Sequence, residues 1–215
     1  MKITVVGSGN VGGALGSRWA EMGHEVTFAS RNPGKDSLRK LISKHGKNAQ
    51  ASAITHAGDG AEVIVLAVPW SAAESAIDQL GNIGQKIVID CTNPIAEGMS
   101  GLTIGTTTSA GEMVQQWMPG AKVVKAFNST GAGNMADSKY DNGKIAMPIC
   151  GDDQDAKKTV KQLAEELGFE VYDAGPLSSS RYLEPMALLW VTLAYKQGLG
   201  PDMAFRIIKR QAKTS

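Results

Sequence analysis

The sequence predicts an α/β fold of the Rossmann type, a doubly wound and mostly parallel sheet with a small C-terminal helical extension. Apolar strand patterns alternate with amphipathic helix patterns through the first two thirds of the chain. The first strand pattern runs directly into a glycine-rich turn that opens the first helix pattern. This order is typical of a dinucleotide-binding βα unit, and right-handed crossovers would then place the strands in one sheet.

Each element is predicted from its own pattern, and the run at 62–67 is apolar throughout, as a parallel strand buried on both faces requires. Strands are expected at 3–6, 25–29, 49–53, 62–67, 86–90, 122–126, 145–150 and 169–172. Helices are expected at 11–22, 37–44, 72–80, 112–117, 154–167, 180–196 and 202–211, with a loop rich in Gly, Ser and Thr at 94–109. Asp152 or Asp153 is expected to cap the helix before Gly168, and Ser179 or Ser180 the next one.

This pattern divides the chain into a dinucleotide-binding domain over residues 1–176 and C-terminal helices over residues 177–215. The stretch at 185–195 is apolar nearly all round, so it should be buried against the sheet domain, a partner subunit or both. We expect the C-terminal helices to form a pocket for a second substrate, with Arg181 and residues 199–203 as its lining, or a homodimer interface.

Composition excludes several classes of protein. Lys and Arg number 22 against 21 Asp and Glu, and no basic stripe indicates a nucleic-acid partner. The longest apolar run is shorter than the roughly 20 residues of a membrane span. Cys91 and Cys150 each follow a predicted strand, and no leader pattern precedes the first strand, so we expect reduced thiols and a cytoplasmic location. The three histidines lie far apart, so no metal site is predicted.

Gly7, Gly9 and Gly12 form a G-x-G-x-x-G pattern between the first strand and the first helix. The first glycine permits a tight turn, the second lets the backbone approach a pyrophosphate, and the third packs helix against strand. The pyrophosphate would lie on the exposed N–H groups of the helix N-terminus. The predicted pyrophosphate loop consists of Gly7, Ser8, Gly9, Asn10, Val11 and Gly12.

The end of the second strand indicates which dinucleotide binds. An NAD enzyme usually carries Asp or Glu there to hold the ribose 2′-hydroxyl. Here Ser30, Arg31 and Asn32 end the strand and Lys35 follows. A hydroxyl and two cations suit a 2′-phosphate, so the sequence predicts NADP(H) as the cofactor. The alternative is that Arg31 and Lys35 are ordinary surface charges.

Loops after three further strands should meet the glycine loop at one edge of the sheet. Val68 and Pro69 are expected along the ribose and nicotinamide, with Asn93 near the carboxamide. Trp70 is either a stacking platform or plain packing. Asn128 and Ser129 are the candidate catalytic residues facing a second substrate, although Asn128 is equally consistent with a loop-stabilising amide. No acid–base pair is evident, and this absence favours hydride transfer between two rings held face to face.

The chain resembles the coenzyme F420-dependent NADP oxidoreductase family, whose relatives include the cytoplasmic domain of the STEAP metalloreductases. The motifs that carry the resemblance are VVGSGNVG, SRNPGK, VLAVPW at 65–70, VVKAFNS at 123–129, CGDD at 150–153 and DAGPLSSSRYLEP at 173–185. The resemblance implies an NADP(H)-dependent oxidoreductase that exchanges hydride with the deazaflavin F420 or a flavin. Archaeal F420 enzymes carry His where this chain has Asn128, which keeps a flavin open as acceptor. An NADPH-dependent imine or carbonyl reductase and a non-enzymatic NADPH sensor are the alternatives.

Overall fold

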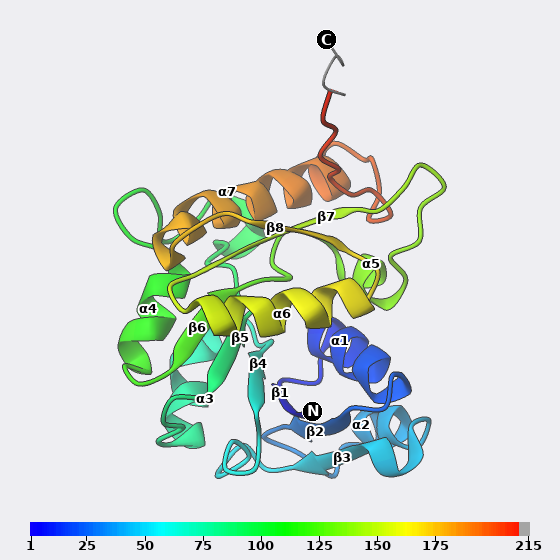
Figure 1. Ribbon diagram of the computed structural model, residues 1–215, viewed down its shortest axis with the longest axis vertical. Coiled ribbons are helices and arrows are strands. Elements are labelled where there is room, and N and C mark those ends of the chain that lie inside the picture. The colour runs from blue at the N-terminus through cyan, green and yellow to red at the C-terminus, as the bar shows by residue number, and fades with distance from the viewer. Residues whose placement is uncertain (211–215) are drawn as a thin grey trace.

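The computed structural model of the protein describes residues 1–210 and contains an eight-stranded sheet with helices on both faces (Figure 1). The strands are β1 (Lys2–Val6), β2 (Glu25–Ala29), β3 (Ala49–Ser52), β4 (Val63–Leu66), β5 (Ile87–Asp90), β6 (Lys122–Lys125), β7 (Ala146–Gly151) and β8 (Glu170–Asp173). Their order is β3-β2-β1-β4-β5-β6-β7-β8; β7 pairs antiparallel with β6 and parallel with β8, so β7 and β8 run opposite to the other strands. The chain starts inside the sheet and winds outward in both directions, so the predicted doubly wound fold is confirmed.

The helices divide the core into two parts, one on each face of the sheet. They are α1 (Asn10–Glu21), α2 (Asp36–Ile42), α3 (Ala73–Leu80), α4 (Ala110–Trp117), α5 (Ala132–Ala136), α6 (Gln154–Glu166) and α7 (Ser180–Val191). Helices α1, α2, α5 and α6 contribute to one cluster of buried apolar side chains, and α3 and α4 to the other. Figure 1 shows α6 crossing in front of the strands and α7 lying over one end of the molecule.

The C-terminal segment corrects one prediction. No helix forms over 202–210, and position 211 lies outside the described residues. Hydrogen bonds to neighbouring elements hold this segment instead: Ala146 N donates to Phe205 O at 2.9 Å, and Trp190 Nε1 donates to Met203 O at 2.9 Å. These tertiary contacts override the local helix pattern. Helix α7 itself continues as a π-helical turn over Thr192–Lys196.

Two helix starts settle alternatives that the sequence left open. Asp153 caps α6, since its Oδ1 accepts from Ala156 N at 2.8 Å. The N-cap residue of α7 is Ser179, one of the two serines expected, but its side chain makes no capping hydrogen bond; Ser180 Oγ lies 3.3 Å from Cys150 Sγ. The short helix α5 falls in a stretch for which the sequence predicted no helix or strand.

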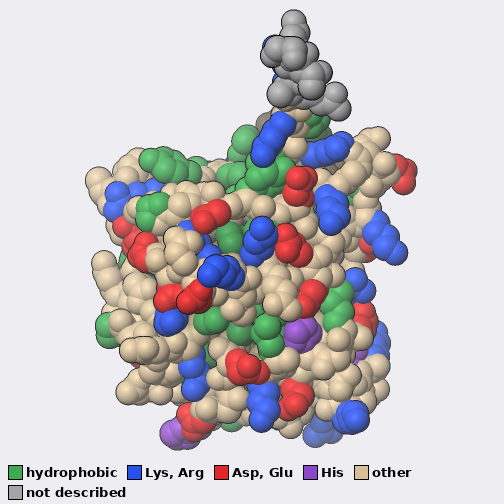
Figure 2. Space-filling view, in the orientation of Figure 1, with side chains coloured by type: hydrophobic (Ala, Val, Ile, Leu, Met, Phe, Trp, Pro, Cys, Tyr) green, Lys and Arg blue, Asp and Glu red, His purple; other side chains and the backbone are tan. Residues whose placement is uncertain are grey.

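The surface and the thiols give further limits on function. On the face drawn in Figure 2, cationic and anionic side chains are interspersed. Within residues 1–210 no helix is long and apolar enough to cross a membrane. Cys91 and Cys150 are free and buried, and burial raises the pKa of the Cys150 thiol to about 11. Both thiols are therefore core residues rather than nucleophiles.

Candidate functional site

The carboxyl ends of five strands align in one row. Register pairs Val6 with Ala29 and Leu66, Leu66 with Asp90, and Asp90 with Lys125. The loops that leave these strands therefore start at the same edge of the sheet. They are the loops in which the sequence placed the cofactor and the second substrate, and this edge is where open parallel sheets bind ligands.

The three fingerprint glycines differ in what the fold requires of them. Gly7 has φ +101°, and a Cβ there would lie 2.5 Å from Ala67 O. A Cβ on Gly12 would lie 1.9 Å from Gly7 O. Gly9 has φ −75°, and a Cβ there would meet nothing within 4 Å. Packing thus explains Gly7 and Gly12 but leaves open space beside Gly9.

That open space lies at the N-terminus of α1. Gly9 is the residue before the helix, and no side chain caps it. The first N–H groups of a helix attract an anion when no side chain occupies them. A pyrophosphate fits this cradle, and a side chain at position 9 would fill it.

A cavity of about 340 Å³ adjoins the cradle. Several predicted site residues line it, namely Gly7, Ser8, Gly9, Ser30, Arg31, Val68 and Pro69. Its opposite wall includes Ser75 and Gln79 of α3. The glycine loop, the end of β2 and the start of the β4 loop thus share one pocket, whereas Asn93, Asn128 and Ser129 are outside its lining.

The residues proposed for the 2′-phosphate lie at the mouth of this pocket. Arg31 and Lys35 are exposed, and no acidic side chain within residues 1–210 pairs with either. Ser30 Oγ accepts from Asn32 N at 3.2 Å. Ser30 and Arg31 line the cavity, whereas Asn32 and Lys35 stand outside its lining. The two cations are therefore available to an anionic ligand.

Trp70 packs against another indole. Its ring stacks on Trp117 with centroids 5.2 Å apart and planes 22° from parallel. This contact joins the turn before α3 to the end of α4. It favours packing over cofactor stacking as the role of Trp70.

The loops after β5 and β6 are tied together by two asparagines. Asn93 Nδ2 donates to Asn128 O at 2.8 Å, and Asn128 Nδ2 donates to Asn93 Oδ1 at 3.0 Å and to Leu183 O at 2.9 Å. Asn128 is 4% exposed and Ser129 2% exposed. Asn128 Oδ1 and Ser129 Oγ are buried without a hydrogen-bond partner. The amide nitrogen of Asn128 stabilises the loop, while these two oxygens are buried with no hydrogen-bond partner among the described residues.

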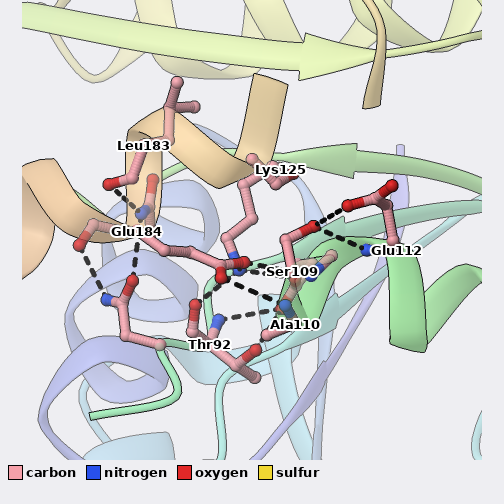
Figure 3. A network of polar contacts seen from close by, with 12 residues as sticks. Thr92, Ser109, Ala110, Glu112, Lys125, Leu183 and Glu184 are labelled. Atoms are coloured by element: carbon pink, nitrogen blue, oxygen red, sulfur yellow. Dashed lines mark hydrogen bonds and ion pairs between the residues drawn. The ribbon is translucent and has the colours of Figure 1, made fainter. Parts of the chain in front are cut away.

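A buried cluster of three charged side chains, Asp90, Lys125 and Glu184, stands beside these loops (Figure 3). Lys125 Nζ lies 2.8 Å from Asp90 Oδ2 and 2.8 Å from Glu184 Oε1, and donates to Thr92 O at 2.6 Å. The three side chains are at most 1% exposed. Burial alone would lower the pKa of Lys125, but the two carboxylates outweigh it and raise that pKa above its ordinary value.

This ion cluster also holds helix α4. Glu184 Oε2 accepts from Ala110 N at 3.0 Å and Oε1 from Gly111 N at 3.0 Å, a favourable position for a carboxylate. Sequence reasoning missed the cluster and assigned no role to its three residues. The available signals were charges ending two apolar strands and a lone glutamate in the C-terminal helix.

A second ion pair links α4 to α7 farther out. Arg181 Nε donates to Glu112 Oε2 at 2.8 Å, and this hydrogen bond lowers the pKa of Glu112. Ser109, which caps α4, also donates to Glu112 Oε2, at 2.7 Å. Arg181, expected in the lining of a second-substrate pocket, is thus held by a carboxylate. Within residues 1–210 no cluster of His, Cys, Asp and Glu has the arrangement of a metal site.

Known proteins share this fold and are similar to this chain in sequence. Residues 2–94 match the family model described as NADP oxidoreductase, coenzyme F420-dependent. A crystal structure from Arthrobacter sp. FB24, provisionally assigned as an F420-dependent NADP reductase, superposes with a TM-score of 0.89 at 30% identity, covering 97% of this chain and 100% of that one. The F420-dependent NADP reductase of Methanocaldococcus jannaschii is 28% identical over 91% of this chain and 93% of its own length.

The metalloreductase STEAP3 of Rattus norvegicus is 31% identical over 190 residues, 87% of this chain. The match spans only 36% of that longer protein, so the likeness concerns one part of it. The expected relationship to both groups is confirmed. This chain belongs to the family of coenzyme F420-dependent NADP oxidoreductases and is an NADP-dependent oxidoreductase.

Proposed function

We propose that the protein transfers a hydride between NADPH and a deazaflavin (F420) or flavin-type acceptor. The observation that carries the proposal is the unobstructed, uncapped cradle at Gly9 beside the unpaired cation Arg31. A fold that needed only a tight turn would not require glycine at that position. When bound, NADPH supplies the hydride from its nicotinamide ring.

Each part of the dinucleotide has a proposed set of contacts. The pyrophosphate binds the loop from Gly7 to Gly12, including Ser8, Asn10 and Val11. The 2′-phosphate binds Ser30, Arg31, Asn32 and Lys35. The nicotinamide half lies along Val68 and Pro69 toward Asn93, with Trp70 supporting the wall through Trp117. Asn128 and Ser129 present their unpaired oxygens to the nicotinamide or to the acceptor.

The acceptor is the finer part of the proposal. Relatives named for F420 support a deazaflavin, and a flavin offers the same flat, hydride-accepting ring system. Catalysis would depend mainly on holding two rings in contact. Among the described residues, the ionisable side chains beside the two asparagine loops, Asp90, Lys125 and Glu184, are all in ion pairs, which fits that requirement better than proton-coupled alcohol oxidation.

The test follows NADPH oxidation spectrophotometrically under anaerobic conditions, with F420, FMN, FAD and riboflavin as separate acceptors. Turnover with F420 or with a flavin supports the proposal and identifies the acceptor. Tight NADPH binding without turnover on any of them would contradict it. The imine or carbonyl reductase and the NADPH sensor would then be tested next.

We also propose a homodimer formed through α7. Its inner face is buried, but Tyr182 is 76% exposed and Leu189 50% exposed on its outer side. A second copy of the chain would cover these apolar side chains. Sedimentation velocity of the wild type and of Leu189→Glu tests this: a dimer that the substitution dissociates supports it, and a wild-type monomer contradicts it.

A further inference from the structure

We propose that Lys125 and Glu184 are positioning residues for the hydride-transfer site, acting through Asn128. The ion cluster fixes the loops after β5 and β6 against α7 and thereby holds the side-chain amide of Asn128, whose Oδ1 is buried without a hydrogen-bond partner. The kinetic part of this inference rests on the proposed function, whereas its structural part concerns the protein alone.

The first argument is the cost of the cluster. Removing a lysine and two carboxylates from water is unfavourable, and well-packed apolar side chains often stabilise a fold as well or better. Here the charges are nevertheless fully buried and fully paired. Two of them, Asp90 and Lys125, are register partners in the row of strand ends that forms the candidate site. Stability alone does not explain charges at this place.

The second argument is the connection to Asn128. Asp90 ends β5 shortly before Asn93, and Lys125 ends β6 shortly before Asn128. Glu184 directly follows Leu183, whose carbonyl accepts from Asn128 Nδ2 at 2.9 Å. Glu184 is therefore adjacent to one acceptor of the Asn128 amide, Asp90 precedes the other acceptor, Asn93, on the same loop, and Lys125 precedes Asn128 itself. Figure 3 shows these contacts meeting where α7 approaches the sheet.

The molecule offers a matched control. The pair Arg181–Glu112 joins the same two helices, α7 and α4, as Glu184 does. It contacts neither Asn93 nor Asn128 among the bonds of the described residues. Glu112→Gln therefore weakens the attachment of α7 without touching the asparagine pair, while Glu184→Gln disturbs both.

The first measurement uses the protein without ligands. Proton exchange of the Asn128 side-chain amide, followed by NMR, should accelerate about tenfold or more in Glu184→Gln because its acceptors are displaced. The same amide in Glu112→Gln should exchange within about twofold of the wild-type rate. Unchanged exchange in Glu184→Gln, or equal acceleration in both variants, would overturn the inference.

The second measurement is kinetic. Glu184→Gln should lower kcat about tenfold or more and leave the Kd for NADPH within about threefold, because orientation rather than affinity is lost. In an Asn128→Ala background the same substitution should change kcat by less than about twofold. Additive effects in this cycle would overturn the inference. If Glu184→Gln does not fold, Glu184→Asp keeps the charge, shortens its reach and is held to the same criteria.

The two proposals fail differently. A wild-type protein that turns over with neither F420 nor flavins contradicts the proposed function. The amide exchange of Asn128 still decides whether the ion cluster positions it. Conversely, an active enzyme with an unperturbed Asn128 amide in Glu184→Gln contradicts the positioning role alone.

Discussion

The glycine loop and the ion cluster occupy the same edge of the sheet but work in opposite ways. The loop depends on empty space, since nothing lies within 4 Å of where a Gly9 side chain would begin. The cluster depends on filled and paired positions, since Lys125 has three acceptors and is completely buried. A substitution at Gly9 should therefore remove ligand binding without unfolding the protein, whereas substitutions in the cluster should destabilise the fold.

Among the substitutions that test this comparison, Lys125→Met should have the largest effect, a loss of unfolding free energy. The substitution leaves two carboxylates buried without their cation, and such a loss costs about 3–5 kcal/mol of unfolding free energy. Urea denaturation monitored by circular dichroism gives the value. At neutral pH the ammonium contribution is fully present, because the raised pKa of Lys125 means it is lost only in strongly alkaline solution.

Lys157→Met is the matched control for that variant. Lys157 is also buried, but its partner Asp173 is 50% exposed and can regain water. Its loss should cost about 1 kcal/mol or less. Equal destabilisation by the two substitutions would show that the ion cluster is no different from an ordinary ion pair at the surface.

Gly9→Val tests the other side of the comparison. The position has room for the side chain, so the unfolding free energy should change by no more than about 1 kcal/mol. The valine would occupy the pyrophosphate cradle, so the Kd for NADPH, from fluorescence titration, should rise by about a hundredfold or more.

Gly12→Ala provides the contrast within the same loop. Its Cβ would meet Gly7 O at 1.9 Å, and such overpacking costs about 1–3 kcal/mol or more in stability. Retained NADPH affinity in Gly9→Val would contradict the placement of the pyrophosphate. Equal stability losses in the two variants would remove the distinction between the glycines.

The same contrast explains how much the sequence could predict. The doubly wound sheet and the glycine loop follow from patterns within a few neighbouring residues, and the structure has them as expected. The ion cluster joins residues from β5, β6 and α7, and Asp90 and Lys125 alone are 35 positions apart. Only the register of the sheet and the path of α7 bring them together. The helix predicted at 202–211 failed for a similar reason, because hydrogen bonds to distant elements decide that segment.

Arg31→Ala should have an effect of intermediate size, and it tests the nucleotide-binding side of the comparison. Loss of a charge-assisted contact to the 2′-phosphate costs about 1.5–3 kcal/mol, or roughly a tenfold to hundredfold rise in KM for NADPH. The KM for NADH, which lacks that phosphate, should stay nearly constant. Lys40→Ala, on the exposed part of α2, is the control and should alter neither value. Equal changes for both nucleotides in Arg31→Ala would argue against NADP(H) specificity.

The smallest expected effect is the pH dependence of the stabilisation that the Arg181–Glu112 ion pair provides. Arg181 holds the pKa of Glu112 below its ordinary value, so the carboxylate stabilises the fold above its unfolded pKa of about 4.3. At pH 7 the unfolding free energy of the wild type should exceed that of Glu112→Gln by about 1 kcal/mol or less. This difference should vanish as the solution is acidified through the lowered pKa of Glu112. Urea denaturation from pH 7 to pH 3 measures it. A difference that persists at the lowest pH would assign the effect to the Ser109 hydrogen bond rather than to charge. Glu112 would then stabilise α4 through local capping. Among the described residues, the electrostatic link between α4 and α7 would rest on Glu184.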